Sequence, residues 1–147
     1  MSVELLIANF LRVANEDLNG ARLLAGAGNR NAIYLCEQAA EKIIRAVVTS
    51  EGKHAGIKHV LAEVDEIPDE NPLKADLRKI EHLSQYATTF RYPVSSSKTK
   101  RIPQPPTPAE LAAAIDDTDA ALANTVAAFK VDLPRVDTPA GTAGPLR

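Results

Sequence analysis

The stretch Asn31–Ser50, NAIYLCEQAAEKIIRAVVTS, decides the fold of this chain. It contains no Gly or Pro and ends before the breaker Glu51-Gly52-Lys53, which predicts a helix of about five turns. On a helical wheel its polar residues share one arc of about 140°. They are Asn31, Tyr34, Glu37, Gln38, Glu41, Lys42, Arg45 and Thr49. Because more than half of the circumference is apolar, several neighbouring elements must cover this helix.

The composition limits what can surround that helix. The chain has 147 residues, of which 45% are hydrophobic and 24% charged, as expected for one globular domain with a single core. Aromatic residues make up only 4% and Trp is absent, so the core must be aliphatic and rich in alanine, which favours closely packed helices. The net charge of −2 argues against tight, sequence-independent binding of nucleic acid.

Cysteine and histidine usage argues against disulfides, metals and other cofactors. The single cysteine, Cys36, excludes an internal disulfide and a cysteine-based zinc site, and its place opposite the polar arc predicts a packing role. His54 and His59 lie five residues apart across a glycine, with no carboxylate at a ligand-like spacing. The N-terminus lacks a leader signature, and no apolar run approaches the ~20 residues of a membrane span. We therefore expect a cytoplasmic protein with no membrane association.

The periodicity of the remaining chain predicts an all-α fold, an antiparallel up-and-down bundle of four to five helices. Glycines at 26 and 28 predict a turn after the first helix, and Thr107-Pro108-Ala109-Glu110 is a capping box that starts the last. The stretch 94–106 is expected to be a loop. Residues 1–131 should form the bundle, and the Pro-, Gly- and Thr-rich residues 132–147 a disordered tail. The expected helices cover residues 2–27, 31–50, 57–67, 72–90 and 107 to about 130.

Asp17 lies inside the apolar stripe of the first helix, between the directions of Phe10 and Leu24. A carboxylate there needs a partner because burying a lone charge is costly. The candidate partners are Lys42, Arg45 and Arg91. Two interpretations stay open: a half-buried structural ion pair, or a residue of a functional site.

Four sequence elements occur in a characteristic order. They are Ala14-x-x-Asp17-Leu18-x-x-Ala21-x-x-Leu24, Gln38-Ala39-Ala40-Glu41-Lys42-x-x-Arg45-Ala46, His59-x-Leu61 and Arg91-Tyr92-Pro93. Together they resemble a HEPN domain (higher eukaryotes and prokaryotes nucleotide-binding), over about residues 5–130. The resemblance implies a helical bundle, commonly a homodimer, and frequent pairing with a small nucleotidyltransferase. Many members of the family are metal-independent endoribonucleases of toxin–antitoxin and defence systems.

The ribonuclease motif of that family, an Arg followed four to six residues later by a His, is not matched. No histidine follows Arg91, since His54, His59 and His82 all precede it, and the spacing from Arg78 to His82 is one residue too short. RNA cleavage needs an acid or base that titrates near neutral pH, which histidine usually supplies. We therefore expect a non-catalytic or degenerate HEPN protein, without a catalytic residue to name.

The expected ligand-binding residues are Arg91, Tyr92, Glu41, Arg45, Asp17 and Lys42. One interpretation is a solvated stripe in which Glu41 supports Arg45 at i,i+4, worth ~0.3–0.5 kcal/mol. The other sets this stripe beside Arg91 and Tyr92 at a cleft, where a carboxylate-held arginine next to an aromatic ring suits a phosphate and a base. Lys98, Lys100 and Arg101 form a small basic tract that is either solvated or clamps an anion.

Three functions follow from these observations. The first is a homodimeric module that binds a nucleotide-type ligand, such as a nucleotide or RNA, or a nucleotidyltransferase partner. The second is a metal-independent endoribonuclease with a different acid–base group. The third is a plain oligomerisation scaffold whose polar stripe is only solvated.

Overall fold

The computed structural model describes residues 2–53, 60–87, 90, 92–95, 100–101 and 104–147. Three long helices dominate: α1 (Val3–Gly26), α2 (Ala32–Ser50) and α5 (Pro108–Phe129). The shorter elements are α3 (Val60–Asp65), α4 (Lys74–Ile80), the 3₁₀ helix η1 (Glu81–Tyr86), and strands β1 (Val94–Ser95) and β2 (Lys100–Arg101).

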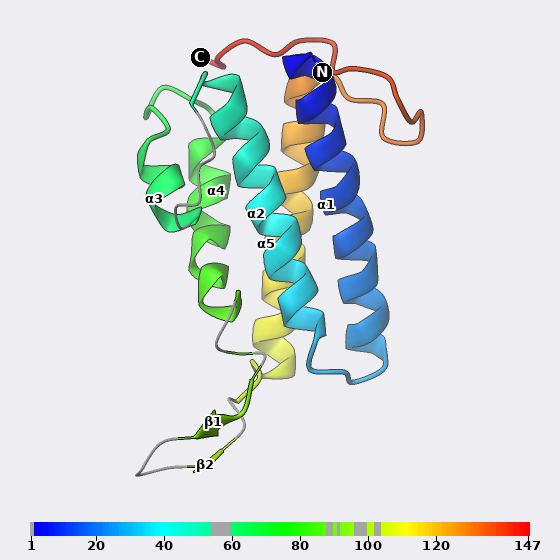
Figure 1. The fold of residues 1–147 in the computed structure, drawn as a ribbon, viewed down its shortest axis with the longest axis vertical. Helices are drawn as coiled ribbons and strands as arrows, with labels where there is room; N and C mark the ends of the chain where they lie inside the picture. Colours follow the sequence, from blue (N-terminus) through cyan, green and yellow to red (C-terminus); the bar gives the residue numbers. More distant parts are fainter. Residues whose placement is uncertain (1, 54–59, 88–89, 91, 96–99, 102–103) are drawn as a thin grey trace.

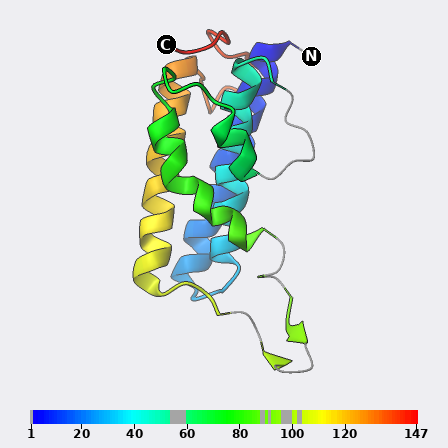
Figure 2. The same ribbon diagram turned by 90° about the vertical axis from the view of Figure 1, so that its left-hand side faces the viewer.

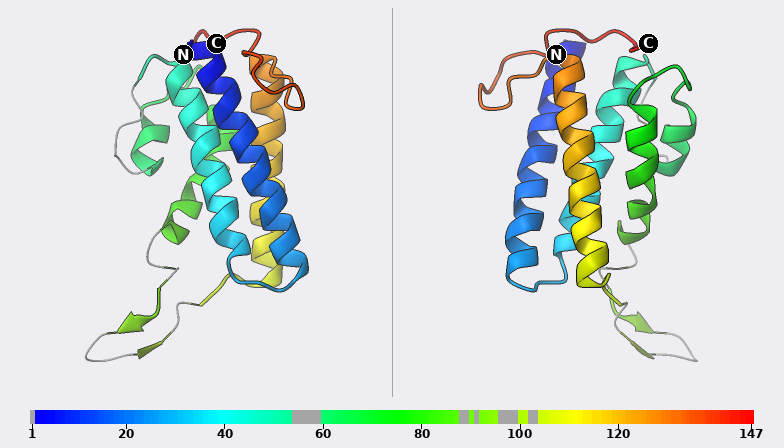
Figure 3. Two further views of the ribbon diagram at one scale, coloured as in Figure 1. Left: turned by 45° about the vertical axis from the view of Figure 1, so that its right-hand side comes forward. Right: turned by 180° about the vertical axis from the view of Figure 1, so that it is seen from behind.

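The helices form an antiparallel bundle, as predicted. α1, α2 and α5 run side by side along the long axis, while α3 and α4 flank α2 on its other side (Figures 1 and 3). The central helix α2 packs against five other elements, which are α1, α3, α4, α5 and η1. The expectation that several neighbours cover the 31–50 helix is thereby confirmed. Asn31 is exposed, and every residue from 32 to 50 is buried or half-buried.

Local signals start and end the long helices. Ser2 Oγ accepts a hydrogen bond from Leu5 N at 3.1 Å, which caps α1. Gly28, at φ 68°, turns the chain between α1 and α2 in a conformation that favours glycine. The capping box of α5 is confirmed, because Thr107 Oγ1 accepts from Glu110 N at 3.1 Å and Glu110 Oε1 accepts from Thr107 N at 2.9 Å.

The core is aliphatic, and its apolar stripes come from all the long helices. Ile43 and Ile44 of α2 are fully buried, together with Leu11 and Leu18 of α1. Cys36 is also buried, with its Sγ 3.3 Å from Thr118 Oγ1 on α5. Its predicted packing role agrees with that position.

The fourth helix is shorter than predicted. Asn71 Oδ1 accepts a hydrogen bond from Leu73 N at 2.9 Å, which fixes a turn at Pro72, so α4 begins only at Lys74. At its other end Ile80 has φ −109°, and the chain continues as η1 rather than as α-helix. The single helix expected over 72–90 is thus two shorter pieces.

The expected loop contains a short strand pairing. β1 and β2 pair antiparallel, Val94 with Arg101 and Ser95 with Lys100, and extend away from the bundle (Figure 2). The sequence carries no alternation of apolar and polar residues that would predict this pairing, because each strand is only two residues long.

The C-terminal strap, residues 131–147, lies across the end of the bundle where both termini meet (Figure 3). The sequence predicted a disordered tail, but the structure places it against α1. Arg12 Nη2 donates to the carbonyl oxygens of Asp132, Arg135 and Thr138 at 3.0, 2.9 and 2.8 Å. Composition did not reveal this arrangement because one guanidinium on a distant helix supplies the donors.

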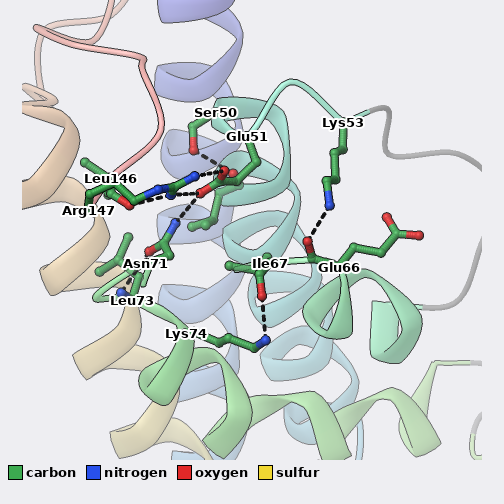
Figure 4. A network of polar contacts seen from close by, with 11 residues as sticks. Ser50, Glu51, Lys53, Glu66, Ile67, Asn71, Leu73, Lys74, Leu146 and Arg147 are labelled. Atoms are coloured by element: carbon green, nitrogen blue, oxygen red, sulfur yellow. Dashed lines mark hydrogen bonds and ion pairs between the residues drawn. The ribbon is translucent and has the colours of Figure 1, made fainter. Parts of the chain in front are cut away.

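At its end the strap joins a polar network around Glu51 (Figure 4). Arg147 donates to both carboxylate oxygens of Glu51, at 2.8 and 3.1 Å, and Asn71 Nδ2 donates at 2.9 Å. These hydrogen bonds hold the pKa of Glu51 below its ordinary value.

Candidate functional site

The charged face of α2 carries Glu37, Glu41 and Arg45, which lie one helical turn apart. Lys42 lies beside them towards α1. This part of α2 stays helical because it holds no Gly or Pro, so the spacing of the charges is fixed by the helix itself.

Asp17 pairs with Lys42. Lys42 Nζ donates to Asp17 Oδ2 at 2.6 Å, and the two side chains are 25% and 20% exposed. The prediction that Asp17 requires a cation is confirmed, and of the two candidates that the structure describes, Lys42 and Arg45, it is Lys42 that pairs with Asp17. This pair joins α1 to α2 at their polar edge.

Glu41 pairs with Arg45 at i,i+4, as predicted. Arg45 Nη2 donates to Glu41 Oε1 at 2.7 Å, and both side chains are about three-quarters buried. This pair is therefore not part of a fully solvated stripe. A carboxylate orients each cation, which is a suitable arrangement for holding a guanidinium or an ammonium towards a ligand.

Glu37 is buried, although the sequence places it in the polar arc. It is only 2% exposed, and Gln38 Nε2 donates to its Oε2 at 2.7 Å. Burial raises the pKa of Glu37 to about 7; the Gln38 hydrogen bond lowers it, while the charge and hydrogen bond of Glu41 raise it further. Glu37 is therefore the group on this face that takes up a proton near neutral pH.

Glu63 on α3 was not among the predicted site residues. It is 2% exposed, and neither of its carboxylate oxygens has a hydrogen-bond partner among the described residues. Burial raises its pKa, the charge of Arg45 opposes this, and the charge of Glu41 adds to it. A signal for it existed in the sequence: Glu63 occupies the inward spacing shared with Val64 and Ile67.

The structure describes only some of the predicted site residues. Tyr92 is described and 65% exposed. Arg91, His54, His59 and Lys98 lie outside the described residues, and of Lys100 and Arg101 only the backbone is described. Glu41, Lys42 and Arg45 lie on one edge of α2, and Asp17 reaches this edge from α1 through its ion pair with Lys42.

Two adjoining hollows lie at the opposite end of the bundle from the strap. One, of about 310 Å³, is lined by Arg30, Ile33 and the prolines before α5. The other, of about 200 Å³, adds His82, Tyr86 and Glu110. None of the described candidate residues on the charged face of α2 lines either hollow.

Neither a metal site nor a membrane span is found in the described part of the chain. No group of three His, Cys, Asp or Glu side chains there is arranged to hold a metal ion. No helix among those residues is both long and apolar enough to cross a membrane.

Comparison with known proteins identifies relatives by sequence and by structure. The family model of the HEPN domain matches residues 7–123. The crystal structure of TT1696 from Thermus thermophilus superposes with a TM-score of 0.60 at 20% sequence identity, covering 81% of this chain and 94% of that chain. At that identity the likeness concerns the fold. No curated protein matches the sequence.

Proposed function

Because this chain belongs to the HEPN domain family, we propose that it is a helical binding module rather than an enzyme. The module binds either a nucleotide-type ligand, which is a nucleotide or RNA, or a nucleotidyltransferase as its protein partner. The proposed binding residues are Arg91, Tyr92, Glu41, Arg45, Asp17 and Lys42.

One observation carries this proposal. Two cations, Lys42 and Arg45, lie on one edge of α2, each oriented by a carboxylate at 2.6 or 2.7 Å and each mostly buried. A side chain held in this way loses little rotational freedom when a phosphate arrives, so the binding cost is reduced. Tyr92, which is 65% exposed, would contribute an aromatic ring that stacks on a base.

Calorimetric titration with a panel of nucleotides tests the ligand. We expect binding to the full chain that weakens at least tenfold in Arg91→Ala and in Lys42→Ala. The matched control is Arg78→Ala, which removes an exposed arginine paired with Asp65 and Glu81, away from the charged face. Binding that is unchanged in both test variants, or no binding to the wild type, would contradict the nucleotide proposal.

A second experiment tests the partner. The family habit of forming homodimers and of pairing with a nucleotidyltransferase leads us to expect a dimer in light scattering and co-purification with a nucleotidyltransferase encoded next to this chain. Reversing the charge of Glu41 should weaken that co-purification. A monomer that captures no such partner would leave only the scaffold function.

A metal-independent endoribonuclease of a toxin–antitoxin or defence system is the second candidate, favoured by the pKa of Glu37, which burial raises to about 7. A carboxyl group that titrates there is suited to general acid–base catalysis at neutral pH. Incubation of the purified protein with tRNA in EDTA tests this function. Specific cleavage that is lost in both Glu37→Gln and Arg91→Ala would establish it and overturn the non-catalytic proposal.

A further inference from the structure

The two adjoining hollows at the end of the bundle opposite the C-terminal strap form one elongated space. They lie where the turn between α1 and α2 comes close to the start of α5 (Figure 1). Ile33 and Pro106 line both of them, so the hollows meet along these two side chains. We call this space the paired hollow. Its larger part alone, about 310 Å³, reaches the lower end of the volumes of small-molecule sites, ~300–1,000 Å³.

The larger part of the paired hollow has mainly apolar walls. Three helices and the chain before α5 contribute to them, through Ala25, Ile33, Leu111, Pro105, Pro106 and Pro108. Arg30 also lines this part, but its guanidinium lies over the ring of Phe90, 4.5 Å from the centroid, and donates to the carbonyl oxygen of Phe90 at 3.1 Å. These walls suit an apolar ring or alkyl chain, because both surfaces leave water when it binds.

The smaller part, about 200 Å³, is lined by two carboxylates. Glu110 and Asp117 are seven residues apart, so they lie on one face of α5, about two turns from each other. Asp117 is half-buried and makes no hydrogen bond or ion pair within the described part of the chain. Hydrogen bonds with Thr107 hold the pKa of Glu110 below its ordinary value, so Glu110 is charged at neutral pH.

The wall opposite these carboxylates comes from η1. It consists of His82, Leu83, Gln85 and Tyr86. The ring of Tyr86 is fixed by an edge-to-face contact with Phe90, at 5.2 Å between centroids. An ionised carboxylate only accepts hydrogen bonds, so a ligand group that lies between Glu110 and Asp117 must donate them.

The two parts of the paired hollow follow each other along α5. Leu111 lines the larger part and Asp117 the smaller part, and six residues of α-helix rise about 9 Å. A molecule that has its apolar body and its N–H donors separated by about this length occupies both parts.

We propose that the paired hollow binds a free hydrophobic amine. The apolar body lies between Ile33, Leu111 and the prolines, and the ammonium group lies between Glu110 and Asp117 beside the ring of Tyr86. Charge-assisted hydrogen bonds to the carboxylates hold the ammonium, and the aromatic ring adds a cation–π attraction. This site lies beyond the proposed nucleotide function, because it selects a positive group and because the described residues proposed to bind a nucleotide do not line it.

Calorimetry on the full chain with 4-phenylbutylamine tests the site. We expect saturable binding that is at least tenfold weaker in Asp117→Asn and in Glu110→Gln. Gln at 110 can still accept from Thr107 N, so the capping box of α5 is kept. The matched control is Asp119→Asn on the same helix, whose exposed carboxylate pairs with Arg22 and should leave amine binding within twofold.

A second pair of variants tests where the apolar body lies. Ala25→Leu places a larger side chain at the wall of the larger part and should weaken binding of 4-phenylbutylamine at least tenfold. The matched control is Ala27→Leu, an exposed position at the end of α1 that lines neither part and should leave binding within twofold.

Three competing probes separate the chemical classes. We expect 4-phenylbutanol and 5-phenylpentanoate, which keep the ring but lack the ammonium, to bind at least tenfold more weakly than the amine. A blocked lysine has the ammonium without the ring and should also bind more weakly. Tighter binding of the blocked lysine would identify a lysine of a partner protein as the ligand and would contradict the proposal of a free amine.

The proposal is wrong if 4-phenylbutylamine does not bind the wild type, if the alcohol or the carboxylate binds as tightly, or if neither Asp117→Asn nor Glu110→Gln weakens binding. These probes contain no phosphate and no base, so failure of the nucleotide titration leaves this test unaffected.

Discussion

Replacing Glu37 by Gln should remove one component of the pH dependence of stability. Gln has the shape of the protonated carboxyl: its oxygen can accept from Gln38, and its amide can donate to Glu41. The variant therefore resembles the wild type with the proton permanently in place.

The magnitude follows from the pKa of Glu37, which burial raises from 4.5 to about 7. The folded protein then holds a proton at Glu37 that the unfolded chain has released. Folding free energy is therefore lost as the pH rises from about 4.5 to about 7. At about 1.4 kcal/mol per pKa unit the loss is about 3 kcal/mol, an upper value because Glu37 interacts directly with the neighbouring Glu41.

Urea unfolding followed by circular dichroism at pH 5, 6, 7 and 8 measures this. Near pH 5 the variant and the wild type should have similar free energies of unfolding. Near pH 8 the variant should be more stable by up to about 3 kcal/mol. Groups such as Glu51, whose pKa is lowered, act with the opposite sign but cancel in the difference.

The matched control is Glu16→Gln, which changes an exposed carboxylate on α1. Its difference from the wild type should not vary with pH in the same range. If Glu37→Gln also shows a constant difference, Glu37 is not the buried, neutral-pH group that we infer.

Three further changes test other parts of the structure. Arg12→Ala should detach residues 131–147, because it removes charged hydrogen bonds to their carbonyl oxygens. Amide exchange in that segment should become faster, and the free energy of unfolding should fall by about 2 kcal/mol. The control Arg22→Ala, which breaks an exposed ion pair, should lower it by less than about 1 kcal/mol. Thr107→Ala should destabilise the protein by about 1 kcal/mol in thermal unfolding, because it removes the cap of α5, and no change would contradict the capping box. Burial raises the pKa of the Cys36 thiol to about 11, so it should react with a disulfide reagent only after unfolding; fast reaction in the native protein would be the contrary result.

Much of the fold could be predicted because its signals are local. Three such signals act within a few residues: the absence of Gly and Pro in 31–50, the capping box at Thr107 and the glycine at 28. The helices begin or end at these signals, as predicted. The i,i+4 spacing of Glu41 and Arg45 is likewise a property of one helix.

The candidate site was predicted only in part. Helical geometry placed Glu37, Glu41 and Arg45 on one face, but a wheel does not say which part of that face another element covers. Glu37 and Glu63 are buried because α2 and its neighbours meet there, and neighbours distant in sequence leave no periodic signal.

The sequence by itself determined the helices, their caps and the apolar stripes, because hydrogen-bonding and hydrophobic periodicity act within one element. The tertiary structure decided which charges are paired and which are buried: Asp17 with Lys42, Arg12 with the C-terminal strap, and Glu63 without a partner among the described residues. The physical reason is that desolvation and ion pairing depend on distances between elements, which are set only when the whole bundle packs.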